Sequence, residues 1–203
     1  TTLIGLLGAA LGLSFEQAMH YKKENQIRFG IIGKSEGKYK DLWKYRKIKQ
    51  GEILSAVLLK EYLYNFQMEL YIVANDLNIV EEVKTSFQNP YYALTLGSSD
   101  DLLKIIKVGD IKEAEKTFIS NFCDTILPGD YSSNYIANFK IEEIPILQEI
   151  HAPQVHLLPT DFDFNGEKRH IKRREPFTIV NIPIKLKEPI EGLHVDGREV
   201  ALL

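Results

Sequence analysis

Residues 1–13 read Thr-Thr-Leu-Ile-Gly-Leu-Leu-Gly-Ala-Ala-Leu-Gly-Leu, and residues 89–101 read Asn-Pro-Tyr-Tyr-Ala-Leu-Thr-Leu-Gly-Ser-Ser-Asp-Asp. In the first stretch Gly5, Gly8 and Gly12 fall on one face of a helix, which leaves that face smooth enough for a neighbouring segment to approach closely. The apolar run is shorter than the roughly 20 residues that span a membrane, and it lacks the basic residues that open a secretory signal. It therefore predicts a helix packed inside a globular protein.

The residues that follow predict strands and helices in alternation. Ser14 and Gln17 form a capping box for a helix that ends near Asn25. Alternating apolar residues predict strands over 27–33 and 55–75, and a helix is expected over 79–87. The second quoted stretch predicts a turn, a strand over 91–96, a glycine corner and an acid-capped helix over 102–107. The Asp196-Gly197 pair predicts a tight hairpin near the end of the chain.

Together, the two quoted stretches resemble the CRISPR-associated Cas5 family, the RAMP-superfamily subunit that caps the 5′ handle of the guide RNA (crRNA) in type I Cascade complexes. The resemblance implies an α+β, ferredoxin-like or RRM-like fold of βαββαβ order, with the first strand missing from this chain. It also implies a thumb-like insertion and a C-terminal β-rich appendage. The expected division is an RRM-like domain over 1–110, with a basic aromatic insertion at about 34–55, and an acidic connecting region with a β-rich subdomain over 111–203.

The insertion carries the strongest chemical signal in the chain. Residues 34–49 contain seven Lys and Arg against two acids and interleave them with three aromatic residues, within what the sequence presents as a loop without periodicity. Cations bind phosphates and flat rings stack on unpaired bases, which together suit single-stranded nucleic acid. A solvated basic loop with its rings against the core is the alternative interpretation. The resemblance implies that this thumb contacts RNA through Lys38, Tyr39, Lys40, Trp43, Lys44, Tyr45, Arg46 and Lys47.

A second basic run lies between residues 168 and 174. Bunched positive charges are costly unless a polyanion is near, and the arginine fork suits phosphate. We expect contact with RNA or target-DNA backbone from Lys168, Arg169, Lys172, Arg173 and Arg174, with an idle exposed turn as the alternative. Residues 110–149, with eight acids against three lysines, predict instead a solvated face or a protein contact.

Composition and motifs limit the kinds of binding site and reaction that the sequence predicts. The 203 residues carry a formal charge of −3, which argues against a uniformly basic nucleic-acid binder, and the single Cys123 reads as a small buried residue. The five histidines have no zinc spacing, and no nucleotide-binding or nucleophile motif is found, so the sequence predicts no metal site, cofactor or catalytic residue. The enzymatic alternative is metal-independent cleavage of pre-crRNA, as in the I-C branch with its Tyr-Lys-His set; Arg169-His170 with Tyr39 or Tyr45 is the nearest approximation.

The resemblance therefore implies a non-catalytic, cytoplasmic RNA-binding subunit in antiviral defence. Its expected partners are the crRNA 5′ handle, the Cascade backbone subunit and large subunit, and target DNA near the PAM, with no membrane. A second alternative is an RRM-like module that binds proteins and no RNA.

Overall fold

The protein is an α+β molecule of antiparallel sheets and three helices within the described residues. The computed structural model describes residues 1–49, 51–140, 142, 151–166 and 168–203. Most of the distal part of the predicted acidic stretch, residues 141 and 143–149, therefore lies outside the described residues. The elements are α1 (Thr2–Leu11), α2 (Phe15–Glu24), β1 (Arg28–Lys34), β2 (Gly37–Lys49), β3 (Glu52–Tyr64), β4 (Gln67–Val73), α3 (Leu77–Gln88), β5 (Lys116–Phe122), β6 (Thr125–Pro128), β7 (Tyr135–Ala137), β8 (Gln154–Asn165), β9 (Lys168–Val180), β10 (Ile184–Val195) and β11 (Arg198–Ala201).

The first two helices form where the sequence predicts them. The Ser14 hydroxyl accepts the Gln17 amide N–H at 3.2 Å, and the Gln17 side chain accepts the Ser14 amide at 2.9 Å, which completes the predicted capping box. Gly12 ends α1 in the left-handed conformation at φ 76°. In the described residues, α1 and α2 have the length and apolar content of a membrane span only when taken together, with a 96° bend between them; no single helix does.

The glycines of α1 do not share one role. A Cβ on Gly8 would lie 2.9 Å from the Ala18 Cβ, so this glycine allows α2 to approach α1. A Cβ on Gly12 would meet the Tyr91 ring at 2.8 Å. A Cβ on Gly5 would meet nothing within 4 Å, so the expected close neighbour is absent at this position among the described residues.

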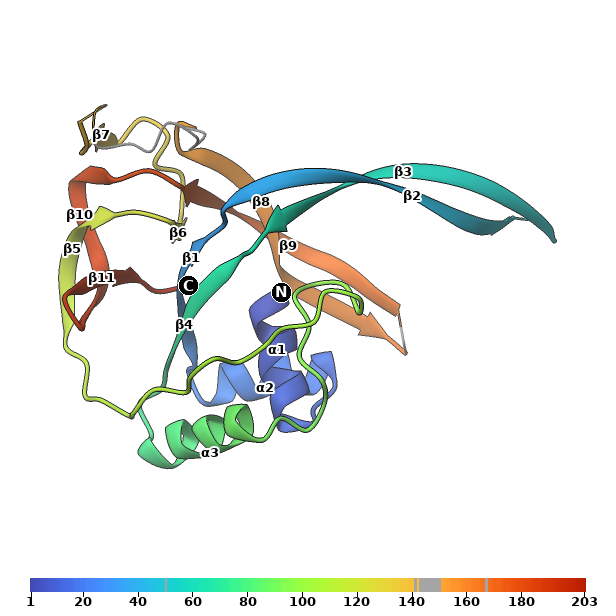
Figure 1. Ribbon diagram of the computed structural model, residues 1–203. Coiled ribbons are helices and arrows are strands. Elements are labelled where there is room, and N and C mark those ends of the chain that lie inside the picture. Colours follow the sequence, from blue (N-terminus) through green and yellow to red (C-terminus); the bar gives the residue numbers. More distant parts are fainter. Residues whose placement is uncertain (50, 141, 143–150, 167) are drawn as a thin grey trace.

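The largest sheet has five strands in the order β4-β1-β6-β9-β8, all antiparallel to their neighbours. The helices cover one side of β1 and β4, where Leu7, Ile27, Phe29 and Val83 form a buried cluster (Figure 1). On the other side, Leu193, Val200 and Leu202 pack against Ile32, Tyr71 and Val73 of these two strands. The pair β1–β4 is thus the middle layer of the molecule.

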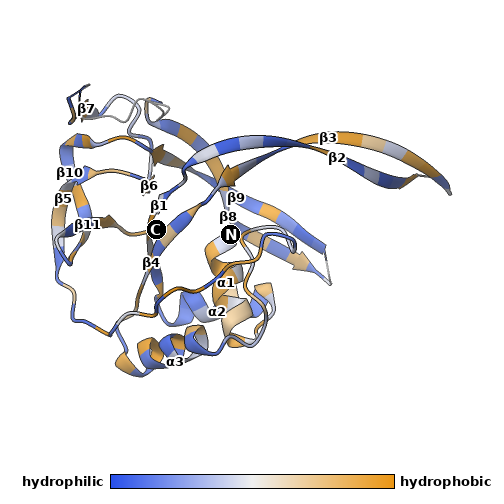
Figure 2. Ribbon diagram, viewed as in Figure 1, coloured by the Kyte–Doolittle hydropathy of each residue, from blue (hydrophilic) through white to orange (hydrophobic). Residues whose placement is uncertain are grey.

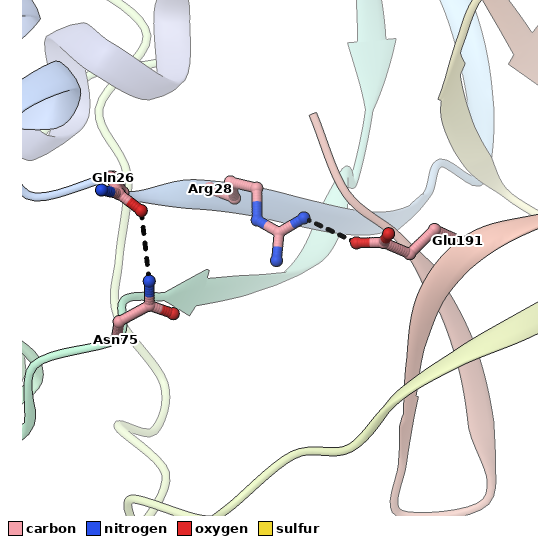
Figure 3. Close-up of polar contacts among 4 residues, drawn as sticks. All are labelled: Gln26, Arg28, Asn75 and Glu191. Atoms are coloured by element: carbon pink, nitrogen blue, oxygen red, sulfur yellow. Dashed lines mark hydrogen bonds and ion pairs between the residues drawn. The ribbon is translucent and has the colours of Figure 1, made fainter.

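A four-stranded sheet of β11, β10, β5 and β7 forms the second β layer. The turn between β10 and β11 is the predicted Asp196-Gly197 pair, with φ values of 50° and 77°. Near the start of β1 an ion pair joins the two sheets, with Arg28 Nη1 3.1 Å from Glu191 Oε1 of β10. Beside it, the Asn75–Gln26 side-chain hydrogen bond of 3.2 Å links the segments that flank β4 and β1 (Figure 3).

Outside the basic aromatic segment, three predictions of secondary structure are wrong. The expected strand over 55–75 is two strands, because the chain turns at Asn65, which has φ 46°. The expected strand over 91–96 is an irregular segment: the amides of Tyr91 and Tyr92 donate to the carbonyls of Ala10 and Ala9 at the end of α1.

The expected helix over 102–107 is extended chain without helical hydrogen bonds. Leu103 and Ile105 pack towards Leu6 and Ala10 of α1, whereas Leu102 and Ile106 are exposed. This alternation has the period of a strand, and burial of the inward residues against α1 takes precedence over the capping signal of the preceding aspartates.

Candidate nucleic-acid interface

The basic aromatic segment is a strand of a long hairpin, which corrects the expectation of a loop without periodicity. β2 pairs with β3 over 13 residue pairs, from Gly37↔Tyr64 to Lys49↔Glu52. The two strands form a sheet of their own and project from the body of the molecule beyond β1 and β4 (Figure 1). A strand of 13 residues spans roughly 40 Å, so most of the hairpin lies away from the core. The hairpin agrees with the thumb that the family resemblance implies.

Strand geometry divides the aromatic residues of this segment from most of its cations. Successive side chains of a strand point to opposite faces, and directly paired residues share a face. Tyr39, Trp43 and Tyr45 therefore lie on one face, which we call the ring face, together with Lys47 and the β3 residues opposite them. The other face carries Lys38, Lys40, Lys44 and Arg46, all from β2, which we call the cation row.

On the ring face the aromatic side chains contact one another across the strands. Tyr39 and Tyr62 stack with ring centroids 5.1 Å apart and an interplanar angle of 12°. The Lys60 ammonium lies 4.5 Å from the centroid of the Trp43 ring and 4.6 Å from that of Tyr62. The result is a ladder of flat surfaces along one side of the hairpin, which suits stacking with unpaired bases.

Lys60 also connects the hairpin to the loop before residue 102. Its ammonium lies 3.8 Å from the Asp101 carboxylate. The Tyr62 hydroxyl and then the carboxylates of Asp101 and Asp100 raise the pKa of Lys60, and partial desolvation opposes the rise. Lys60 and Tyr62 were missed by the sequence analysis because they lie on β3, outside the basic run; their pairing with residues of β2 is the signal that identifies them.

Few acidic side chains neutralise the positive charge of the cation row. Lys40 forms an ion pair of 3.0 Å with Glu61, and within the described part of the chain no acidic side chain pairs with Lys38, Lys44 or Arg46. These side chains are exposed. Their positive charge is thus available to an anion, and it lies next to the ring face along the open edge of β2.

The second basic run lies on another long hairpin, β8–β9, and its cations are more fully engaged. The Arg169 guanidinium lies 4.6 Å from the ring centroid of Phe15 and 4.9 Å from that of Phe162. The partners of the next three cations are Asp163 for Lys172 at 3.5 Å, Glu175 for Arg173 at 3.6 Å, and the Leu157 carbonyl for Arg174 at 3.3 Å. Lys168 is exposed, and its neighbour at position 167 is outside the described residues. Internal contacts make this run less available to a polyanion than the cation row.

The residues of the enzymatic alternative lie on different hairpins. Tyr39 and Tyr45 belong to β2 and His170 to β9, and no hydrogen bond or ring contact joins them among the described residues. In the same part of the chain no three His, Cys, Asp or Glu side chains come together as a metal site. Cys123 is half-buried beside Asp124, and desolvation and then this carboxylate raise the pKa of its thiol to about 12, which disfavours the reactive thiolate.

Comparison with known protein families shows which family the chain belongs to. The model of a family described as CRISPR-associated protein (Cas_Cas5) matches residues 1–154, about three quarters of the chain. The chain belongs to the Cas5 family. No curated protein matches it. Cas5 membership gives the chain a CRISPR-associated role in a family that is generally a non-catalytic subunit of Cascade, with some members that process crRNA.

Proposed function

We propose that this Cas5 protein is the non-catalytic RNA-binding subunit of a type I Cascade complex, that it holds the 5′ handle of the crRNA, and that it docks the large and backbone subunits in the cytoplasm. The observation that carries the proposal is that one projecting hairpin has a ring face and a cation row in which, among the described residues, only Lys40 is paired with an acid. A single-stranded RNA that crosses the open edge of β2 places its bases against Tyr39, Trp43 and Tyr45. Its phosphates then lie beside Lys38, Lys40, Lys44, Arg46 and Lys47.

The β8–β9 hairpin takes a secondary part in this proposal. Lys168, Arg169, Lys172, Arg173 and Arg174 are exposed, so a second polyanion segment, RNA or target DNA near the PAM, can exchange for their internal partners. Because such an exchange breaks existing contacts, this contribution to affinity is smaller than that of the first hairpin.

The fold that we propose for this role is ferredoxin-like. The order α1-α2-β1-β4-α3, with the helices on one side of an antiparallel strand pair, matches most of a βαββαβ unit once β2 and β3 are treated as an insertion between β1 and β4. The edge of β4 away from β1 has no backbone partner in the described residues, which is the position that a further strand of such a unit takes.

Titration of a labelled single-stranded repeat RNA over a salt series tests the proposal. Trp43→Ala is expected to weaken binding about 5- to 150-fold, because stacking contributes about 1 to 3 kcal/mol per base, with the salt slope unchanged. Trp43→Phe, which keeps a ring, should retain most of the affinity. The double variant Lys44→Gln/Arg46→Gln should instead flatten the salt slope, by roughly 0.7 for each phosphate that the variant no longer neutralises.

Lys185→Gln, an exposed lysine on β10, is the matched control and should bind as the wild type does. Wild-type binding that ignores salt, or equal binding by all variants, contradicts the proposal. The same samples, incubated in EDTA and resolved by length, should contain intact RNA; cleavage that His170→Ala abolishes would establish the enzymatic alternative.

A further inference from the structure

The face of the β2–β3 hairpin opposite the rings carries a row of aliphatic side chains. Six residues on this side are between 48% and 76% exposed, and we call them the aliphatic face: Leu42, Ile48, Ile53, Val57, Leu59 and Leu63. Leu42 pairs directly with Leu59, and Ile48 with Ile53, so the side chains form cross-strand apolar pairs. Figure 2 shows apolar and hydrophilic residues interspersed along the projecting hairpin.

Nothing in the described molecule covers this face. β2 and β3 form a two-stranded sheet, and none of the six residues belongs to a buried cluster. The Lys40–Glu61 and Arg46–Ser55 pairs divide the aliphatic face into a central group of Leu42, Val57 and Leu59 and smaller apolar groups at either end. An isolated two-stranded hairpin is marginally stable in water, and apolar side chains exposed together mark an interaction site or an aggregation hazard. A hairpin that carries such a surface on one side and aromatic rings on the other is stabilised when both sides are covered.

The ring face also exposes Leu54 and Leu58, but within the hairpin aromatic rings occur only on this face, so the ligands that fit the two faces differ. Flat rings accept bases from any nucleotide, whereas Leu, Ile and Val side chains offer no stacking surface and fit other aliphatic groups. The charges on the aliphatic face come from the cation row, because Glu61 is the one acid on this side and is paired with Lys40. A complementary surface is therefore apolar at its centre and acidic at its rim.

We propose that the aliphatic face docks a protein partner whose surface has an apolar centre and a carboxylate rim, while RNA occupies the ring face. The inference rests on the proposed function and adds a division of labour between the two sides of one hairpin. A second copy of this chain does not fit, because two aliphatic faces in contact would oppose Lys38, Lys44 and Arg46 of one copy to the same residues of the other. The cation row borders both surfaces, so its long side chains serve phosphates at the edge of β2 and carboxylates at the rim of the partner.

Site-specific photo-cross-linking separates the two faces with neighbouring residues. Leu58 lies on the ring face, opposite Trp43, and Leu59 lies on the aliphatic face, opposite Leu42; both are exposed, at 54% and 55%. Leu59→p-benzoylphenylalanine and Leu58→p-benzoylphenylalanine would each be placed in the full chain, co-expressed with the other proteins and guide RNA of its CRISPR locus. The purified complex is then irradiated, and the products are identified by mass spectrometry after nuclease or protease treatment.

The expected products are a protein–protein adduct from position 59 and a protein–RNA adduct from position 58. The inference is overturned, and the proposed function kept, when position 58 reaches RNA while position 59 reaches RNA, lipid, a second copy of this chain or nothing. Absence of an RNA adduct from position 58 argues against the proposed function itself. A protein adduct from both positions favours the protein-binding module without RNA.

A pair of substitutions provides a quantitative readout. Val57→Asn/Leu59→Asn removes two exposed aliphatic side chains without touching the ring face, so affinity for the single-stranded repeat RNA should stay within about twofold of wild type. Retention of the chain in the assembled complex, measured by native mass spectrometry over a dilution series, should fall by about tenfold or more. Lys185→Gln, exposed on β10 and remote from both faces of the hairpin, is the control. Unchanged retention of the double variant contradicts the inference.

Discussion

At the scale of single residues, the glycines of α1 show how one repeated residue type serves unlike purposes. Gly8 is required by space, because Ala18 Cβ and the Leu13 carbonyl lie where its side chain would be. Gly12 is required by its left-handed backbone and by the Tyr91 ring. Helical spacing alone predicts that the three glycines share a face, but which of them has a neighbour depends on α2 and on residue 91, which spacing does not reveal.

We predict opposite effects for two alanine substitutions in this helix. Gly5→Ala should raise the free energy of unfolding by about 0.5 to 1 kcal/mol, since alanine is the better helix former and its methyl group meets open space. Gly8→Ala should lower it by about 1 to 3 kcal/mol, because the methyl group overlaps Ala18. Urea denaturation followed by circular dichroism measures both. Equal effects at the two positions would contradict this assignment.

At the scale of elements, the β2–β3 hairpin sorts onto two faces a set of residues that looks irregular in the sequence. Residues 34–49 indicate cations and rings but no secondary structure, because Lys44 and Arg46 separate Leu42 from Ile48 on one side, while Asp41 and Lys47 share the other side with the rings. No simple polar and apolar period results. The residue types of the candidate site could thus be predicted, whereas its division into faces and the participation of Lys60 and Tyr62 depend on cross-strand pairing.

In the second sheet, a carboxylate satisfies backbone groups that strand pairing leaves free. The register of β10 against β5 shifts between Lys185 and Ile190. At this irregularity the amides of Ser120 and Asn121 donate to Glu199 Oε2 of β11, at 2.8 and 2.6 Å. Partial burial opposes ionisation of Glu199, but these amides and the Asn121 side chain outweigh it and lower the pKa of the carboxyl group below its usual value.

We predict that Glu199→Gln lowers the free energy of unfolding by about 1 to 2 kcal/mol at neutral pH, because charge-assisted hydrogen bonds are lost. A depressed folded-state pKa gives stability that is complete above the unfolded-state pKa of Glu and is lost as the pH falls through the folded value. The difference between variant and wild type should therefore shrink in acid. Chemical denaturation at pH 7 and at pH 3 measures it, with exposed Glu188→Gln as the control; a gap that widens in acid would refute this account.

At the scale of the whole molecule, the chain after residue 110 joins the strands before it. β6 pairs with β1 and β9, Leu203 exchanges backbone hydrogen bonds with Phe29, and Val200 packs over Gly30. Local signals such as the Ser14 capping box and the Asp196-Gly197 turn are readable from sequence because neighbours decide them. The paths of residues 91–107 and the contact between β11 and β1 are not, because distant residues decide them.

Gly30→Ala should therefore weaken both sheets together. A Cβ at this position would lie 2.3 Å from Val200 Cγ1 and 3.0 Å from the Ala201 carbonyl, so we expect the free energy of unfolding to fall by about 1 to 3 kcal/mol. Hydrogen exchange should show reduced protection of Ile72 in β4 and Leu193 in β10 by the same free energy. Gly37→Ala, which meets open space, should change neither. A loss confined to one sheet would mean that the sheets unfold independently.

The position of Lys60 has a consequence for the proposed stacking of nucleotides on the rings. The Lys60 ammonium contacts the Trp43 ring and lies near the Asp101 carboxylate, so it covers part of the indole surface. In the proposed RNA complex, a base that stacks on Trp43 displaces the Lys60 ammonium, which is then free to pair with the neighbouring phosphate. This exchange of the Trp43 ring for a phosphate disfavours association of RNA-free hairpins through their rings. It also favours a charged strand over neutral planar compounds as a ligand.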